Sequence, residues 1–334
     1  MSQPTRVSYG FMAAMLLVVA MLGLATPLLT VLFSIFALNV FSFKRRSKTM
    51  AVALFLIAVT TICLGTLFFF SQAILVAPKI AEKLVPTVVE FCSSHGIELP
   101  FKNVESLVAL IKTESMERLG LAGIAATHAL RQTAFVLIGM VVAISLYYNA
   151  TIVIDRDKHT LKNNLYSLSA DEITKRFELF YRSFHTVMGA QILISFINSA
   201  MTGIFLFAAN YPYWQLLLAV TFLCGLLPIL GNILSNTIIV SVGLTVDFHH
   251  ALAALAFLMV VHKLEYFLNS KIIGKRIQNP MWMTLLGLIL GERLMGVPGM
   301  ILAPVILHYI KSEASRVAVE QKTEELVPVE SAKP

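Results

Sequence analysis

The stretch that decides the fold runs from Met50 to Val76 and reads MAVALFLIAVTTICLGTLFFFSQAILV. It contains no charged residue, and a helix needs about 20 apolar residues to cross the roughly 30 Å hydrocarbon core of a bilayer. Of all 334 residues, 57% are hydrophobic and only 13% are charged, which leaves too little polar surface for a water-soluble protein of this size. The composition predicts an all-α integral membrane protein and excludes an ordinary soluble enzyme and a disordered chain.

Further apolar segments bring the total to about eight. Arg6 and the basic cluster at residues 44–48 belong on the cytoplasmic side, which two crossings with a turn at Pro27 would satisfy. The net charge of +7 fits loops that face an anionic membrane leaflet, and we expect no nucleic-acid partner. The other segments lie at residues 7–24, 28–43, 133–154, 184–209, 215–246, 251–268 and between the basic clusters near 276 and 311.

Glycine and proline interrupt two of these segments: residues 225–232 read GLLPILGN, and residues 291–299 read GERLMGVPG. Backbone that leaves a helix inside a bilayer loses hydrogen bonds worth several kcal/mol per group. Such breaks survive where they border other protein or a water-filled cavity, so they indicate a transport pathway.

The basic residues of the last third predict that both breaks re-enter the membrane. If the two basic clusters are cytoplasmic, the segment between them is a hairpin that turns within residues 291–299. Residues 215–246 would dip in and return in the same way, whereas plain crossings would give eight helices and place the first cluster outside. The clusters are Lys271, Lys275 and Arg276, and Lys311 and Arg316.

Polar insertions divide the chain into regions. A capping-box pattern, Ser169-x-x-Glu172, predicts a helix start in the second insertion. In the first, apolar residues recur at helical spacing, which indicates either a cap on the bundle or an interfacial helix or lid. We expect three N-terminal membrane helices (1–76), an extracytoplasmic amphipathic insertion (77–127), a fourth membrane helix (128–154), a cytoplasmic amphipathic helix (155–183), a transport core with broken helices (184–310) and a cytoplasmic acidic tail, disordered by composition (311–334).

Polar residues inside the apolar runs are the candidate site. Gln191, Ser195, Asn198 and Thr202 form one helical stripe, which either joins helices or borders a solute path. Glu265 shares a face with His262 and Asn269, and ionisable residues in membrane segments usually mark function.

Other candidates lie at the breaks, where Asn232 and Asn236 either contact a hydroxylated solute or cap free carbonyls. Glu292 and Arg293 are paired or wet if their hairpin tip reaches the bilayer centre and merely solvated at an interface. The predicted substrate pathway comprises Gln191, Asn198, Pro228, Gly231, Asn232, Asn236, Glu265, Asn269, Gly274, Glu292, Arg293, Gly296 and Pro298.

Motifs for catalysis are lacking. The sequence has no P-loop, no H-E-x-x-H and no G-x-S-x-G motif, and its three cysteines form no C-x-x-C pair. We therefore expect no enzyme activity, cofactor, metal site or disulfide framework, and any transport is passive or driven by an ion gradient.

The C-terminal sequence closely resembles the signature of the autoinducer-2 exporter family, the PerM-like permeases. The resemblance rests on residues 268–276 (LNSKIIGKR), on Asn279-Pro280, and on residues 296–304 (GVPGMILAP). The residues Pro228 to Gly231 resemble a second, Pro-x-x-Gly motif of that family, and the likeness covers nearly the whole chain. The sequence departs from the family pattern at Ser270, Asn279, Asn232 and Ser235.

The resemblance implies a multi-pass bacterial inner-membrane protein that forms a homo-oligomer, for example a pentamer. The basic clusters place both termini in the cytoplasm. Three functions stay open. The first is the export of a small polar organic solute that resembles the furanone-type quorum signal autoinducer-2. The second is sodium/proton antiport through Glu265, Glu292 or Asp247. The third is a membrane scaffold that transports nothing.

Overall fold

The computed structural model describes residues 2–42, 47–94, 96–109, 121–149, 164–227, 230–273 and 280–317, with the side chains of residues 121–126, 266–273 and 281 excepted. Within these ranges the regular structure is helical throughout and contains no strand. The helices are α1 (Gln3–Met21), α2 (Ala25–Phe41), α3 (Lys48–Ser94), α5 (Leu121–Tyr148), α6 (Leu165–Ala208), α7 (Trp214–Gly225), α8 (Leu230–Leu244), α9 (Phe248–Ile273) and α10 (Met281–Ala314).

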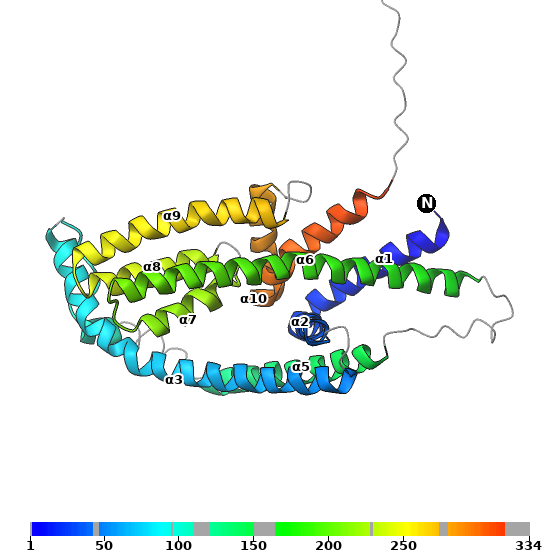
Figure 1. Ribbon diagram of the computed structural model, residues 1–334, viewed down its shortest axis with the longest axis horizontal. Helices are drawn as coiled ribbons and strands as arrows, with labels where there is room; N and C mark the ends of the chain where they lie inside the picture. Colours follow the sequence, from blue (N-terminus) through cyan, green and yellow to red (C-terminus); the bar gives the residue numbers. More distant parts are fainter. Residues whose placement is uncertain are drawn as a thin grey trace, which may run out of the picture.

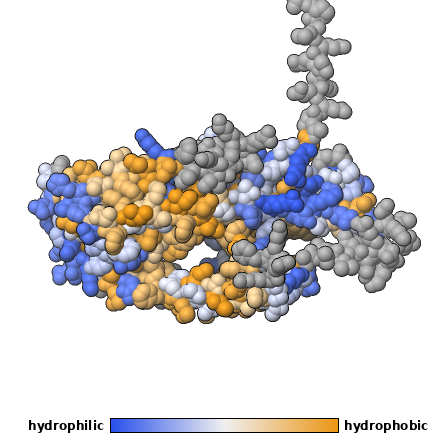
Figure 2. All heavy atoms as spheres, in the orientation of Figure 1, coloured by the Kyte–Doolittle hydropathy of each residue, from blue (hydrophilic) through white to orange (hydrophobic). Residues whose placement is uncertain are grey.

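The long helices lie roughly along one axis (Figure 1). At one end of this axis α1 begins and α10 ends, and we call it the terminal end. At the other, the loop end, α3 finishes near the α6–α7 and α8–α9 loops. Among the described residues, α1, α3, α5, α6 and α10 each contain a stretch long and apolar enough to span a bilayer. Figure 2 shows apolar surface over the middle of the molecule and polar surface at both ends, which confirms the predicted all-α membrane protein.

The break between the first two apolar helices lies three residues earlier than the sequence predicts. α1 ends at Met21 and α2 begins at Ala25, so Pro27 lies in the first turn of α2, where a missing N–H costs no helical hydrogen bond. In Figure 1, α2 is seen nearly end-on while α3, α5 and α6 are seen from the side. Its 17 residues therefore run across the long helices, and the turn between α1 and α2 lies at residues 22–24 and not at Pro27. That both segments cross the membrane stays a prediction.

α3 continues far beyond the apolar stretch that defines it. Pro78 and Pro86 lie inside the helix, which ends at Ser94. A proline removes one intrahelical hydrogen bond and bends a helix without always ending it. The end of α3 accordingly curves across the loop end of the molecule (Figure 1). Only residues 104–109 of the predicted amphipathic insertion helix are described, and they are helical behind the cap Asn103, whose Oδ1 accepts from the Ser106 N–H at 2.8 Å.

α6 is one helix of 44 residues that joins the second polar insertion to the fifth apolar run. Its N-cap is Asn164, whose side chain accepts a hydrogen bond from the Ser167 N–H at 2.9 Å. The predicted capping box at Ser169 is therefore wrong: Ser169 lies inside the helix, because Asn164 already supplies the acceptor that a cap needs.

Two separate cores pack along α6. The first joins its N-terminal half to α1, α2 and α10, around Phe180, Phe184 and Met188. The second joins its C-terminal end to α7, α8 and α9, around Leu206, Leu217 and Ile239. α6 is thus the shared wall of two packing units.

α10 is a helical hairpin. Gly296 adopts φ 65° and ψ −151°, a conformation that L side chains avoid, and its two arms meet where Gly291 and Gly299 touch backbone to backbone. A Cβ on Gly299 would lie 1.9 Å from the Gly291 carbonyl oxygen, so neither arm tolerates a side chain there. The predicted turn within residues 291–299 is confirmed, and α10 packs mainly on α6, α2 and α1.

Candidate transport site

The other break lies between α7 and α8. Trp214 begins α7 at the loop end, and Gly225 ends it eleven residues later, a rise of about 16 Å or half of the hydrocarbon core. α8 begins at Leu230 and runs back toward the loop end, and the two short helices pack on each other. A Cβ on Gly231 would lie 1.6 Å from the Cys224 carbonyl oxygen, so the close approach of the two helices requires glycine.

The four last carbonyl groups of α7 all have donors. The amides of Leu226 and Leu227 donate to the carbonyls of Leu223 and Cys224 at 3.3 and 2.8 Å. The two remaining carbonyls are served by the polar stripe of α6: Gln191 Nε2 donates to Gly225 O at 2.7 Å, and Ser195 Oγ donates to Phe222 O at 2.8 Å. An interrupted helix is stable in hydrocarbon only with such partners. Gln191 and Ser195 thus hold the break in place.

The next stripe residue, Asn198, contacts the predicted carboxylate. Glu265 Oε2 accepts from Asn232 Nδ2 at 2.7 Å and from Asn198 Nδ2 at 3.2 Å. His262 Nδ1 lies 4.0 Å from the same oxygen. α6, α8 and α9 therefore each contribute a polar side chain, and we call Glu265, Asn198 and Asn232 the Glu265 cluster.

The Glu265 cluster is largely buried and has no strong cation. The side chain of Glu265 is 15% exposed, and among the described residues no lysine or arginine forms an ion pair with it. Within the described part of the chain, the buried Asn198 Oδ1 has no hydrogen-bond partner. An unpartnered buried oxygen beside a carboxylate held by neutral amides is an arrangement that a hydroxylated solute, a cation or a proton would complete.

The remaining predicted residues divide into three groups. Asn236 is half-buried on α8, one turn beyond Asn232. Glu292 and Arg293 are exposed on the first arm of α10, Gly296 forms its turn, and Pro298 borders an apolar cavity against α2, so the structure does not bring them to the Glu265 cluster. Pro228, Gly274 and the side chain of Asn269 lie outside the described residues.

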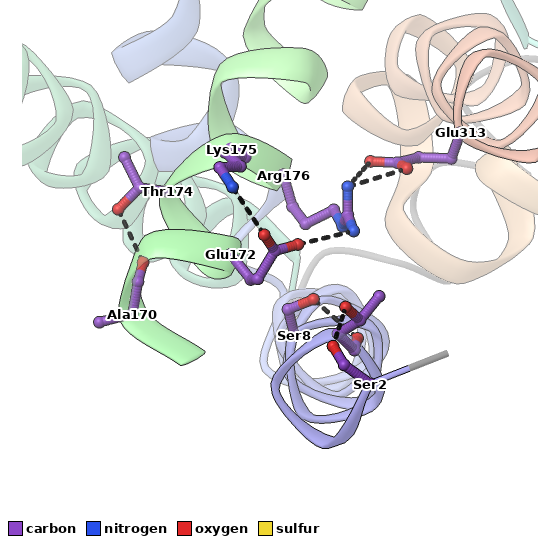
Figure 3. Close-up of polar contacts among 9 residues, drawn as sticks. Ser2, Ser8, Ala170, Glu172, Thr174, Lys175, Arg176 and Glu313 are labelled. Carbon is purple, nitrogen blue, oxygen red and sulfur yellow. Dashed lines mark hydrogen bonds and ion pairs between the residues drawn. The ribbon is translucent and has the colours of Figure 1, made fainter. Parts of the chain in front are cut away.

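The sequence analysis missed a second charged cluster, at the terminal end (Figure 3). Arg176 on α6 contacts Glu172 Oε2 at 3.1 Å and Glu313 Oε2 of α10 at 3.2 Å. Tyr9 of α1 donates to Glu313 at 3.0 Å, and its ring centroid lies 4.5 Å from Arg176 Cζ. The Arg176 and Glu313 side chains are only 12% and 7% exposed. Only the i,i+4 pair of Glu172 and Arg176 is visible in the sequence, because the other partners are far apart along the chain.

The sequence of the chain is similar to those of known transport proteins. The model of the AI-2E family transporters matches residues 7–316, which includes both breaks and the Glu265 cluster. The chain belongs to this family. Over 136 residues it is 29% identical to the putative transport protein YdbI of Bacillus subtilis (strain 168), a match that covers 39% of this chain and 38% of that protein. No solved structure matches the chain.

Proposed function

We propose that this AI-2E family member exports a small polar organic solute of the autoinducer-2 type across the bacterial inner membrane. The route passes the α7–α8 break, and the terminal end, with both chain termini, faces the cytoplasm. The observation that carries the proposal is the Glu265 cluster. Among the described residues, its largely buried carboxylate accepts hydrogen bonds from two amides and has His262 at 4.0 Å, and it lies beside a helix about half as long as the hydrocarbon core is thick.

The chemistry of the cluster favours a ligand with hydroxyl groups. Glu265 and the free Oδ1 of Asn198 are acceptors, and a hydroxylated furanone would donate to both. Gln191 and Ser195 are already engaged with α7 and support the path without contacting the solute. We assign no catalytic role, cofactor or metal.

The test is solute efflux from proteoliposomes that contain the purified protein. Replacing Glu265→Gln keeps the shape of the side chain and removes the charge, and we expect solute efflux to fall by at least about tenfold, the effect of losing a hydrogen bond to a charged group. Glu292→Gln is the matched control, since that carboxylate is exposed on α10. Equal efflux by both variants and the wild type would remove the Glu265 cluster from the path.

A second candidate, sodium/proton antiport, rests on the same carboxylate, which forms no ion pair with a described lysine or arginine and would bind a proton and a sodium ion in turn. A pH-sensitive dye inside the vesicles reports proton movement when sodium is added outside. Antiport requires a sodium-dependent pH change that Glu265→Gln abolishes. Solute efflux with no such pH change supports the first proposal instead, and a chain that moves neither is a membrane scaffold.

We also propose that the protein forms homo-oligomers, of which a pentamer is one form. The membrane part of α3 exposes many large apolar side chains, among them Ile57, Ile62, Phe68 and Ile74, each more than 60% exposed. Neighbouring copies or lipid must cover this surface. Mass measurement of the detergent-solubilised protein tests the assembly, and a monomer at all concentrations would contradict it.

A further inference from the structure

The loop end of the molecule contains a polar recess beneath the curved end of α3. A cavity of about 650 Å³ is lined by Lys79, Glu82 and Lys83 of α3, by Asn210, Pro212 and Tyr213 of the α6–α7 loop, and by Thr245 and Val246 after α8. Lys79 and Lys83 are one helical turn apart and therefore share a face of α3. No ion pair within the described part of the chain involves either lysine. Two ammonium groups thus line one recess.

Along α3, Lys79 lies within the lipid headgroup layer and Lys83 just beyond its outer edge. Val76 ends the apolar stretch of α3, so Lys79 lies three residues and Lys83 seven residues beyond it, about 4.5 and 10 Å along the helix axis. The headgroup layer extends about 5 to 8 Å beyond the hydrocarbon core on each side. Tyr213 and Trp214 lie at the same end, and such aromatic residues mark this interface.

The loop that lines the recess is held in an unusual conformation. Asn210 and Tyr213 have φ of 51° and 57°, and they are the only non-glycine residues with positive φ among those described. Between them, Tyr211 is 2% exposed and donates from its hydroxyl to His250 O at 2.6 Å. Strained backbone persists where the surrounding structure enforces it, often at binding sites. The buried Tyr211 therefore fixes the shape of the polar recess.

An apolar cavity adjoins this recess and shares Thr245 and Val246 with it. It measures about 570 Å³ and is lined by Val88 and Phe91 of α3 and by apolar side chains of α8 and α9, including Leu244, Leu252 and Leu255. Asp247 also lines it, but its carboxylate is engaged by the amide and the ring of His250 at 2.7 and 2.8 Å. A polar recess beside an apolar one fits a ligand with a polar head and an apolar tail.

We propose that these adjoining recesses bind one anionic phospholipid, with its phosphate between Lys79 and Lys83 and one acyl chain in the apolar cavity. Glu82 and Asn210 then accept hydrogen bonds from a hydroxyl-bearing headgroup such as glycerol, and the carboxylate of Glu82 disfavours ligands with several negative charges. The lipid links the end of α3 to the α6–α7 and α8–α9 loops. The site is distinct from the Glu265 cluster and does not depend on the transported solute.

The test is native mass spectrometry of the full-length protein from nanodiscs of phosphatidylglycerol and phosphatidylcholine in equal amounts. We expect one retained phosphatidylglycerol, and an approximately 30-fold weaker retention in the double variant Lys79→Gln/Lys83→Gln, since each lysine contributes about fivefold near a membrane surface. The matched control, Lys102→Gln/Arg131→Gln, removes the same charge elsewhere and keeps the lipid. Val88→Asp leaves both lysines in place and also loses the lipid, because it puts a charge in the acyl cavity.

Four results would overturn the proposal. Equal retention by the Lys79/Lys83 and control variants means that the lysines do not bind the headgroup. Equal retention of phosphatidylcholine means that charge plays no part. Displacement of the lipid by millimolar inorganic phosphate, or its retention by Val88→Asp, means that the recess takes a free anion and no acyl chain.

Discussion

Two largely buried carboxylates, Glu265 and Glu313, differ in the charge of the groups that they contact. Glu313 of α10 faces the guanidinium of Arg176 on α6 and accepts from Tyr9 on α1, so its charge is neutralised and the cluster joins three helices. Glu265 also connects three helices, but its two hydrogen bonds come from neutral amides. A buried charge with a cation fixes structure, whereas one without a cation keeps the capacity to bind or titrate. We therefore interpret the terminal-end cluster as structural and the Glu265 cluster as functional.

The largest expected effect on stability comes from breaking the structural cluster. Glu313→Ala leaves the nearly buried Arg176 with Glu172 alone, and removing one partner of a buried ion pair costs about 3–5 kcal/mol of unfolding free energy. Chemical denaturation in detergent, followed by helical circular dichroism, measures this loss. Lys175→Ala breaks only a surface pair and should change the unfolding free energy by less than about 1 kcal/mol.

A charge-free replacement sharpens the same comparison. The double variant Arg176→Met/Glu313→Leu removes both charges together, and such replacements are often neutral or stabilising. We expect it to unfold close to the wild type and to transport normally in the proteoliposome assay. Normal folding with abolished transport would show that the terminal-end cluster takes part in the transport cycle.

A smaller effect is expected at the donors of the Glu265 cluster. Asn232→Ala removes the 2.7 Å hydrogen bond to Glu265, and a hydrogen bond to a charged group is worth about 1.5–3 kcal/mol. We expect solute efflux to fall at least about tenfold if that energy acts on transport. Asn236→Ala, one turn along α8, is the control and should transport as the wild type does. Equal losses in both variants would indicate a general requirement for polarity on α8 in place of a site.

The smallest effect concerns the start of α9. Asp247 accepts from the His250 N–H, and this backbone hydrogen bond, followed by the one from the His250 ring, holds the pKa of Asp247 below its ordinary value of 3.8. The contribution to stability is therefore present above that value and is lost as the pH falls through the lower pKa of the folded state. Melting curves of wild type and Asp247→Asn should differ at neutral pH and converge at an acid pH below the lowered pKa of Asp247 in the folded state. A constant difference at both pH values would exclude the carboxylate as the cause.

The sequence predicted the membrane class and both breaks, because each is a local property of the chain, and it proposed polar residues that the structure places together. Met50–Val76 identifies a membrane helix by itself, and the Asn198–Asn232–Glu265 set stood out as polar residues in apolar runs. The family and the transporter class followed from motifs near the C-terminus and are confirmed by the match over residues 7–316.

The predictions that failed concern features that depend on competition between residues for the same role or on contacts between residues far apart in the sequence. Ser169 lies inside α6 because Asn164 supplies the N-cap, and which of two possible caps is used depends on neighbouring structure. Glu292 and Glu265 looked equivalent, but α10 packs with the first core of α6 and α8 with the second, so the two breaks occupy different packing units. Arg176 and Glu313 are 137 residues apart, and no local pattern joins them.

The most direct measurement is the water accessibility of Asn232. In a background with Cys63, Cys92 and Cys224 replaced by serine, Asn232→Cys is exposed to a membrane-impermeant methanethiosulfonate reagent, and Ile239→Cys, at a site 1% exposed on the same helix, serves as the control. If the Glu265 cluster borders an aqueous route, the cysteine at position 232 reacts far faster than the control, and the transported solute slows the reaction. Equal protection of both cysteines would mean that the break is dry, and would contradict the account.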